Sequence, residues 1–148
     1  MSSKLEAIGI AKRYGEALAL EPTDLAVQAG EFLTLLGPSG SGKTTLLQMI
    51  SGLVAPSAGR IEIDGRDVTH VEPGKRGIGM VFQSYALFPH MSVWDNVAYG
   101  LRMRRKSRDE VRAAVDSALA MVRMTDYAKR FPKELSGGQQ QRIALARC

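Results

Sequence analysis

The sequence predicts an α/β fold, and three consecutive segments carry that prediction. Residues 32–36 form a nearly unbroken apolar run, which is typical of a parallel strand that is covered on both faces. A glycine-rich turn follows over 37–42, and residues 43–51 then have the pattern of a helix that Gly52 ends. A buried strand, a tight turn and a helix in this order are the repeating unit of α/β proteins.

Composition excludes several classes of protein before any motif is considered. The 148 residues are 45% hydrophobic and 24% charged with a formal net charge of +5, which excludes disordered, collagen-like and coiled-coil chains. A chain of this length buries roughly two-thirds of its unfolded surface, so it needs no disulfide or structural metal. Its single cysteine, Cys148, cannot form a disulfide within the chain. We find no transmembrane or secretory segment and expect a cytoplasmic protein.

Two further strands are expected before the apolar run. They lie around residues 5–8 and 25–27, and they are separated by breakers at Gly15, Pro22 and Gly30.

A small hairpin and a second buried strand are expected after the first helix. Isoleucines alternate with charged residues over 61–63 and precede an Asp-Gly turn, which predicts the hairpin. Residues 78–82 have the apolar composition of a buried strand that runs into Gln83. Beyond Gln83 the pattern becomes helical, with Ser92 as the expected N-cap of a helix over 93–104.

Two more helices are expected toward the end of the chain. Ser107 and Glu110 have the spacing of a capping box, and an apolar stripe of helical period follows them. The stripe consists of Val111, Val115, Ala118, Leu119 and Val122. Ser136 is the expected N-cap of a last helix that continues toward Cys148.

The segment 37–44 matches the phosphate-binding pattern G-x-x-x-x-G-K-[ST] in its required context between a strand and a helix. Its glycines let the backbone wrap phosphate oxygens, and the helix N-terminus adds a positive dipole end. Lys43 would neutralise the β- and γ-phosphates, and the Thr44 hydroxyl would coordinate Mg²⁺. The alternative is a glycine-rich turn with a solvated lysine. The expected contacts to ATP are Gly37, Pro38, Ser39, Gly40, Ser41, Gly42, Lys43, Thr44 and Thr45.

The second motif is Leu-Ser-Gly-Gly-Gln at residues 135–139. Taken alone it could be an ordinary helix N-terminus capped by Ser136. With the phosphate loop, and with its continuation Gln-Gln-Arg-Ile-Ala-Leu-Ala-Arg over 140–147, it resembles the signature helix of the ABC transporter ATPases. The resemblance covers the chain from Leu5 onward.

The resemblance implies a P-loop NTPase fold with an N-terminal antiparallel β subdomain and an α-helical signature subdomain. Residues 1–83 would form the nucleotide-binding core and residues 84–148 the helical subdomain. The family's Walker B strand, D-loop and switch histidine have no counterpart in these 148 residues, so we expect the fold to be incomplete at its C-terminal end. We also expect this fragment alone not to hydrolyse ATP, because the catalytic carboxylates belong to that missing part.

The resemblance also assigns roles to individual residues. Tyr14 would stack on adenine, with an exposed turn as the alternative. Lys43 and Gln83 would be the catalytic residues of this chain, and Gln83 together with Thr44 would contact Mg²⁺. The γ-phosphate of an ATP held by a second subunit would be contacted by Ser136, Gly137, Gly138 and Gln139.

The family's partners follow from the same resemblance. Two ATPase subunits would meet head to tail on the inner face of the cell membrane. Residues 85–94 would receive a helix of a transmembrane permease subunit, or their aromatic side chains would form a core cluster. A solute-binding protein would act indirectly, and no nucleic acid is expected. The basic run over 102–108 is interpreted as a solvated face, with anionic lipid headgroups as the alternative.

The implied function is the ATP-binding subunit of a bacterial ABC importer. Residues 73–97 are similar to importers for polyamines, ferric iron, sulfate and sugars, with the polyamine group the most similar. Two alternatives remain open. One is a soluble ABC-type ATPase that acts on nucleic acid or ribosomes, and the other is a non-catalytic fragment that binds nucleotide.

Overall fold

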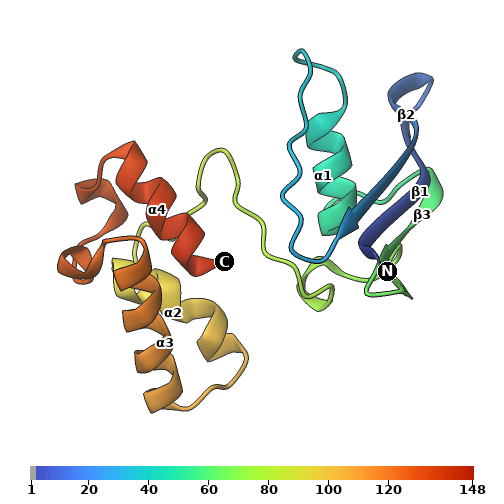
Figure 1. Ribbon diagram of the computed structural model, residues 1–148. Helices are drawn as coiled ribbons and strands as arrows, with labels where there is room; N and C mark the ends of the chain where they lie inside the picture. Colours follow the sequence, from blue (N-terminus) through green and yellow to red (C-terminus); the bar gives the residue numbers. More distant parts are fainter. Residues whose placement is uncertain (1–2) are drawn as a thin grey trace. The chain divides into compact units, whose positions relative to one another are not determined.

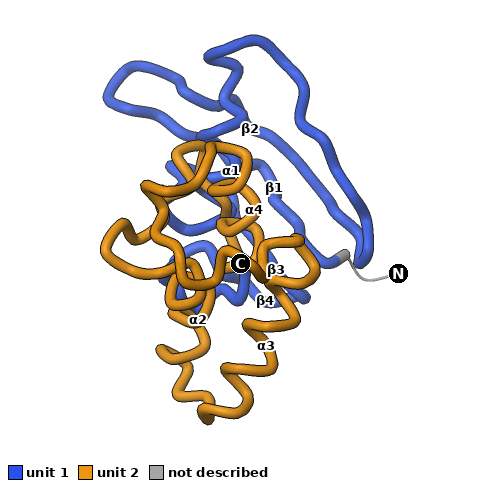
Figure 2. Tube along the Cα trace, turned by 90° about the vertical axis from the view of Figure 1, so that its left-hand side faces the viewer, with its two compact units in different colours: residues 1–78 blue, residues 79–148 orange. Residues whose placement is uncertain are grey.

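The computed structural model describes residues 3–148, which fall into two compact units, residues 3–78 and residues 79–148 (Figure 2). The first unit contains a sheet and one helix, and the second contains three longer helices (Figure 1). Among the described residues, none of the helices has both the length and the apolar character needed to cross a bilayer.

The sheet of the first unit is antiparallel throughout. Its strands are β1 (Ser3–Tyr14), β2 (Ala17–Gln28), β3 (Ala58–Ile63) and β4 (Arg66–Asp67), in the spatial order β2-β1-β3-β4. The predicted first two strands and the predicted hairpin are therefore confirmed, and β1 and β2 are longer than the apolar pattern indicated.

Pro22 does not break a strand as predicted, because it lies inside β2. β2 pairs only with β1 and forms an edge of the sheet. Proline lacks an N–H group but is tolerated at an edge or at an irregularity. The register of the pair shifts between the partners of Ile10 and Lys12, which are Thr23 and Leu20, so the irregularity surrounds Pro22.

Helix α1 (Lys43–Ser51) has the bounds that the sequence predicted, and it ends at Gly52, which adopts a left-handed φ of 82°. The helix packs against the sheet (Figure 1). The core between them consists of Ala7, Ile10, Leu46, Met49, Ile50, Ile61, Ile63 and Val68.

Two predicted strands are wrong. Residues 32–36 and 78–82 have no regular secondary structure. Phe32 and Leu36 expose 92% and 89% of their surface. A parallel strand forms only beside a hydrogen-bonding neighbour, and the sheet of the described residues contains four strands that pair with one another. The apolar residues at 32–36 are therefore suited to a buried strand, but none of the four strands of this sheet pairs with them.

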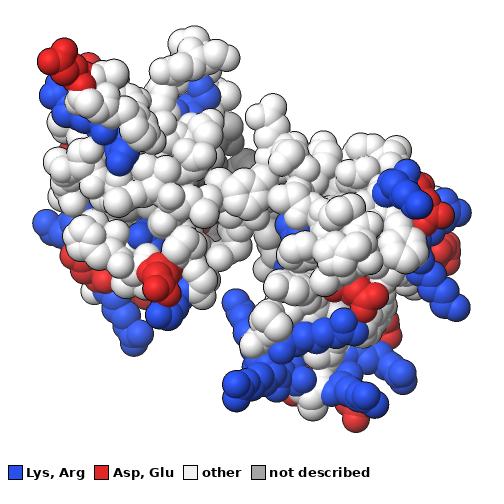
Figure 3. All heavy atoms as spheres, turned by 180° about the vertical axis from the view of Figure 1, so that it is seen from behind, with Lys and Arg blue, Asp and Glu red and all other residues white. Residues whose placement is uncertain are grey.

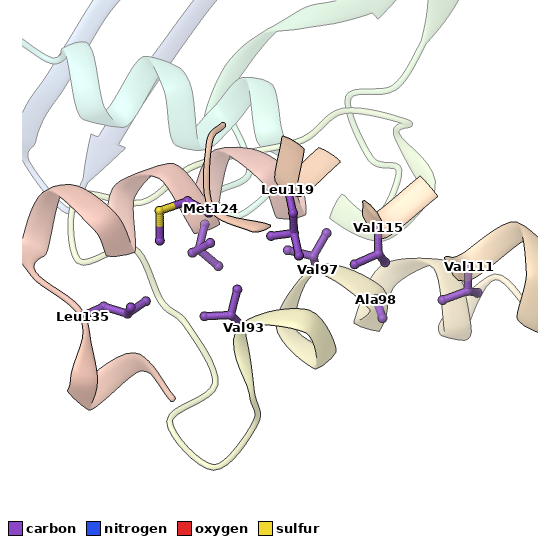
Figure 4. Close-up of a cluster of buried hydrophobic side chains, with 9 residues drawn as sticks. Val93, Val97, Ala98, Val111, Val115, Leu119, Met124 and Leu135 are labelled. Atoms are coloured by element: carbon purple, nitrogen blue, oxygen red, sulfur yellow. The ribbon is translucent and has the colours of Figure 1, made fainter. Parts of the chain in front are cut away.

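The second unit is a helical cluster. Its helices are α2 (Val93–Met103), α3 (Arg108–Met121) and α4 (Gly137–Arg147), with short 3₁₀ turns η2 (Thr125–Tyr127) and η3 (Pro132–Glu134) between the last two. A third such turn, η1 (Pro73–Lys75), lies in the first unit. Figure 4 shows the apolar core that the three helices share, which consists of Val93, Val97, Ala98, Val111, Val115, Leu119, Met124, Leu135 and Ile143.

The predicted N-caps of these helices are confirmed. The Ser92 hydroxyl accepts the Asp95 N–H at 3.1 Å. Ser107 and Glu110 form a reciprocal capping box, in which the Glu110 carboxylate accepts the Ser107 N–H at 2.9 Å and the Ser107 hydroxyl accepts the Glu110 N–H at 3.3 Å. Each bond satisfies a backbone N–H that has no acceptor within its helix.

The capping box predicts how the stability of the second unit depends on pH. The Ser107 N–H, and after it Lys106, lower the pKa of Glu110 from its ordinary 4.5 to about 2. A carboxyl with a lowered folded-state pKa stabilises the fold above its unfolded pKa, and this contribution disappears as the pH falls from about 4.5 to about 2. We expect wild type to exceed Glu110→Gln in stability at neutral pH and this advantage to shrink over that interval.

Urea unfolding followed by the fluorescence of Trp94, the single tryptophan, measures this difference at each pH. Asp116→Asn is the matched control, because Asp116 is an exposed carboxylate on the same helix. An advantage of wild type over Glu110→Gln that is equal at both ends of the interval would contradict the prediction.

Candidate nucleotide-binding site

The phosphate loop connects the irregular segment after β2 to the N-terminus of α1 (Figure 1). A cavity of about 340 Å³ opens at this loop. It is lined by Ala19 and by every residue from Ser39 to Thr45. The structure therefore brings seven of the nine predicted phosphate-contact residues to a single cavity.

The loop needs glycine for a reason that the structure makes concrete at Gly42. Gly40 and Gly42 both have a φ of 84°, in the left-handed region that residues with a Cβ rarely adopt. A Cβ at Gly42 would also lie 2.6 Å from Leu20 Cδ1 and 3.1 Å from the Ala19 carbonyl oxygen. Gly42 thus lets the loop turn directly against β2 at the point where α1 begins.

Lys43 lies inside the curve of the loop. Its Nζ donates to the carbonyl oxygens of Gly37 and Pro38 at 2.8 and 2.6 Å and to the Ser41 hydroxyl at 2.8 Å. The N–H groups of the first turn of α1 have no acceptor within the helix, and no acidic residue lies in that turn. An ammonium group, free N–H groups and a helix dipole therefore converge on one cavity, which is the chemistry that binds phosphate.

This cavity offers a divalent cation fewer protein ligands than it offers a phosphate group. Thr44 is exposed in the first turn of α1, and its hydroxyl is a suitable oxygen ligand. Within residues 3–148, no group of three or more His, Cys, Asp or Glu side chains could hold a metal ion. The donor set fits a Mg²⁺ that arrives with its phosphate ligands, because Mg²⁺ at nucleotide sites takes few ligands from the protein.

Tyr14 is the last residue of β1 and is paired with Ala17 across a tight turn. Its side chain is 54% exposed, and the Lys12 Nζ lies 5.0 Å from the centroid of its ring. Tyr14 is therefore exposed beside the turn, at the end of a strand and not within the turn itself. An exposed ring can also stack on a base, so the adenine role of Tyr14 stays a prediction.

The signature segment forms the N-terminus of α4. The Ser136 hydroxyl accepts the Gln139 N–H at 3.3 Å, and Gln139 Oε1 accepts the Ser136 N–H at 2.9 Å. Gly137 and Gly138 are exposed in the first turn, and Leu135 is buried in the core of the second unit. The capped helix N-terminus considered from the sequence is present. The Ser136 cap accepts the Gln139 N–H, so the N–H groups of Gly137 and Gly138 remain without an acceptor inside the helix.

The remaining predicted site residue, Gln83, is exposed in an irregular segment. It belongs to the second unit, together with residues 136–139, whereas the phosphate loop and Tyr14 belong to the first unit. The structure thus assembles the phosphate loop locally, and it leaves the roles of Gln83 and of the signature segment as predictions.

The sequence did not reveal three polar side chains that hold the end of α1 and the segment after Gln83 in place. Arg76 and Asn96 are almost completely buried, and Arg147 is half-buried. Only Asn96 had a signal in the sequence, because it follows Val93 by three residues and precedes Val97 on the buried stripe of α2. The contacts of Arg76 and Arg147 are distant in sequence and leave no local pattern.

The basic run over 102–108 lies at the α2–α3 connection, where Lys and Arg side chains gather at one end of the second unit (Figure 3). All of its cations are exposed. Arg102 pairs with Asp95 at 3.0 Å, and Lys106 pairs with Glu110 at 2.9 Å. The solvated-face interpretation of this run agrees with these contacts.

Comparison with known proteins identifies relatives along almost the entire chain. The model of the family described as ABC transporter matches residues 20–148. The spermidine/putrescine import ATP-binding protein PotA of Acidothermus cellulolyticus is 55% identical over 135 residues, covering 91% of this chain and 35% of that protein. The sulfate/thiosulfate import ATP-binding protein CysA of Mycobacterium bovis is 54% identical over 136 residues, covering 92% and 39%. The chain thus spans less than two-fifths of the length of either relative.

A solved structure has the same fold. It is the dimeric structure of a post-hydrolysis state of the ATP-binding cassette MJ0796 bound to ADP and Pi. The TM-score is 0.86 at 34% identity, and the match covers 97% of this chain and 68% of that one. This likeness confirms the predicted P-loop fold class with its antiparallel β subdomain and helical subdomain. By its family match, its relatives and its fold, the chain belongs to the ABC transporter family.

Proposed function

We propose that this chain is the nucleotide-binding part of the ATP-binding subunit of an ABC importer, which couples ATP binding and hydrolysis to solute uptake. The observation that carries the proposal is the cavity at 39–45, on which the Lys43 ammonium and the first-turn N–H groups of α1 converge. Two of its relatives are import ATP-binding proteins, which supports the importer assignment.

The residues of the cavity divide the work of binding ATP. The first-turn N–H groups of α1 would hold the β-phosphate, and Lys43 would exchange its carbonyl partners for phosphate oxygens. The Thr44 hydroxyl would hold Mg²⁺, and Tyr14 would stack on adenine. The bound Mg²⁺-ATP supplies the phosphoryl group that is transferred to water in this family.

Hydrolysis needs groups beyond this cavity. The lining residues include no carboxylate that could orient a water molecule for attack on the γ-phosphate. Within the proposal, Gln83 would sense the γ-phosphate of the ATP bound in this cavity. The γ-phosphate of the ATP bound by a second ATPase subunit would be contacted by this chain's Ser136, Gly137, Gly138 and Gln139. The solved relative is itself described as dimeric, which supports this arrangement. We therefore propose that this chain alone binds ATP without efficient turnover.

The other partners follow from the importer assignment. Residues 85–94 would contact a transmembrane permease subunit, which would hold this subunit at the inner face of the cell membrane. A solute-binding protein would act only through the permease. We propose that the solute is a polyamine, because the chain is 55% identical to the spermidine/putrescine import protein. Sulfate or thiosulfate is the alternative, because the identity to the sulfate/thiosulfate import protein is 54%.

Replacing Lys43 tests the proposal. Lys43→Ala removes the ammonium group from the phosphate cavity, and we expect the affinity for Mg²⁺-ATP to fall by about tenfold or more, because charge-assisted bonds to phosphate are lost. Isothermal titration calorimetry on the purified chain measures this change.

Lys75→Ala is the matched control, because Lys75 is an exposed lysine of the same unit that pairs with Glu72. We expect it to bind ATP within about twofold of wild type. Equal affinities of Lys43→Ala and wild type, with α1 intact by amide exchange, would refute the phosphate-cavity argument.

A further inference from the structure

The segment directly after Gln83 has a strained backbone. Tyr85 and Ala86 have φ values of 60° and 47°, so two consecutive residues with a Cβ adopt the left-handed conformation. This conformation crowds Cβ against the following carbonyl oxygen, and it persists only where surrounding contacts hold it. Turn bonds alone support it locally, from the Tyr85 N–H to the Phe82 oxygen at 2.9 Å and from the Ala86 N–H to the Ser84 oxygen at 2.7 Å.

Arg147, the last residue of α4, supplies the missing support. Its Nη1 donates to the Ala86 carbonyl oxygen at 2.7 Å, and its Nη2 donates to the Tyr85 carbonyl oxygen at 3.1 Å. Its guanidinium carbon lies 5.6 Å from the centroid of the Phe88 ring. The planar fork of arginine bonds two successive carbonyls at once, which the single ammonium of lysine does less well.

The end of α4 also approaches the other side of Gln83. The Cys148 thiol donates to the Met80 carbonyl oxygen at 3.4 Å. A Cβ at Gly79 would lie 3.0 Å from the Cβ of Cys148, so the two backbones come close. Contacts from two neighbouring residues at the end of α4 therefore bracket Gln83 on both sides.

We propose that Arg147 is a positioning residue for Gln83, which holds the segment after Gln83 in its left-handed conformation against the end of α4. The opposite end of this eleven-residue helix is the signature segment, so one rigid element joins residues 136–139 to the support of Gln83. The functional meaning of this link rests on the proposed function. Loss of the two guanidinium bonds would let Tyr85 and Ala86 relax and release Gln83 from α4.

Amide exchange of Tyr85 and Ala86 in the full chain tests this role. In Arg147→Gln we expect both amides to exchange about tenfold faster or more, because the turn bonds that protect them open when the left-handed pair relaxes. Arg147→Lys should give an intermediate rate. Arg142→Gln, an exposed arginine of the same helix, is the matched control and should stay within about twofold of wild type.

A second variant separates positioning from mere packing. Glycine adopts a left-handed φ without crowding, so Ala86→Gly should make the support of Arg147 less necessary. We compare amide exchange in the double variant, Arg147→Gln with Ala86→Gly, with exchange in Ala86→Gly alone. The double variant should exchange less than about threefold faster. Glycine cannot restore lost packing on Phe88, so an undiminished acceleration in this pair would overturn the proposal. Unchanged exchange in Arg147→Gln, or equal acceleration throughout α2 and α3, would overturn it too.

ATP titration of the same variants keeps this proposal distinct from the proposed function. Arg147→Gln should bind Mg²⁺-ATP as wild type does, because the phosphate loop belongs to the other unit. A wild-type chain that fails to bind ATP would refute the proposed function, whereas the exchange of Tyr85 and Ala86 would still decide whether Arg147 holds the segment.

Discussion

Replacing Arg76 with methionine is expected to lower the free energy of unfolding of the first unit by about 3 kcal/mol or more. Arg76 is only 6% exposed and donates four hydrogen bonds to backbone carbonyl oxygens. Nη1 bonds Met49 and Ile50 at 2.9 Å each, Nη2 bonds Thr69 at 3.0 Å, and Nε bonds Val71 at 2.7 Å. Methionine has similar length but no donor, so it would leave buried carbonyls unpaired.

The position of Arg76 at the end of α1 explains why a buried cation is tolerated there. Burial lowers the pKa of its guanidinium, but the carbonyls of Met49 and Ile50 form the negative end of the α1 dipole and favour the charge. Gly52 admits the side chain, because a Cβ at Gly52 would lie 2.5 Å from the Arg76 Nε. Arg76 therefore fixes the end of the helix whose other end carries the phosphate loop.

Amide exchange of α1 and β1 measures the effect of Arg76→Met on the first unit. The urea transition of Trp94 reports the second unit and should not move. Arg76→Lys should be intermediate, and Arg66→Met, at an exposed arginine of β4, is the matched control. Exchange in α1 that is as slow in Arg76→Met as in wild type would show that the four bonds do not stabilise the unit.

Local signals in the sequence predicted most of the helical structure. Helix α1 runs from Lys43 to Ser51 as predicted, because Gly42 and Gly52 adopt left-handed conformations that end a helix on either side. The caps at Ser107 and Ser136 are predictable because a helix cap depends only on residues within one turn, and Ser107 also has Glu110 at the spacing of a capping box. The phosphate loop was found for the same reason, since its geometry depends on consecutive residues.

Features that depend on distant partners escaped prediction. The apolar run at 32–36 indicated a strand, but a strand needs a neighbour, and the pattern does not name one. Arg76 contacts a residue 27 positions away, and Arg147 contacts residues 61 and 62 positions away. Neither contact has a sequence spacing that could reveal it. The strained pair Tyr85 and Ala86 was equally hidden, because its residue types favour no left-handed turn.

Asn96→Leu is expected to lower the free energy of unfolding of the second unit by about 3 kcal/mol. Asn96 is fully buried, and its amide has four hydrogen-bond contacts. The carbonyl oxygens of Phe88, Met91 and Ser92 lie 3.0–3.1 Å from its Nδ2 and share the two hydrogens of that group, and its Oδ1 accepts the Phe88 N–H at 2.8 Å. Leucine fills a similar volume, so the loss would come from the unpaired backbone groups and not from a cavity.

Urea unfolding followed by Trp94 fluorescence measures the effect of Asn96→Leu, and Gln141→Leu at an exposed amide of α4 is the matched control. We expect the control to stay within about 0.5 kcal/mol of wild type.

Asn96 holds the segment after Gln83 from α2 at Phe88, whereas Arg147 holds it from α4 at Tyr85 and Ala86. If the two side chains act on separate ends, Asn96→Leu should accelerate exchange of the Phe88 amide more than that of Ala86. A uniform acceleration of both amides would instead mean that the segment opens as one piece.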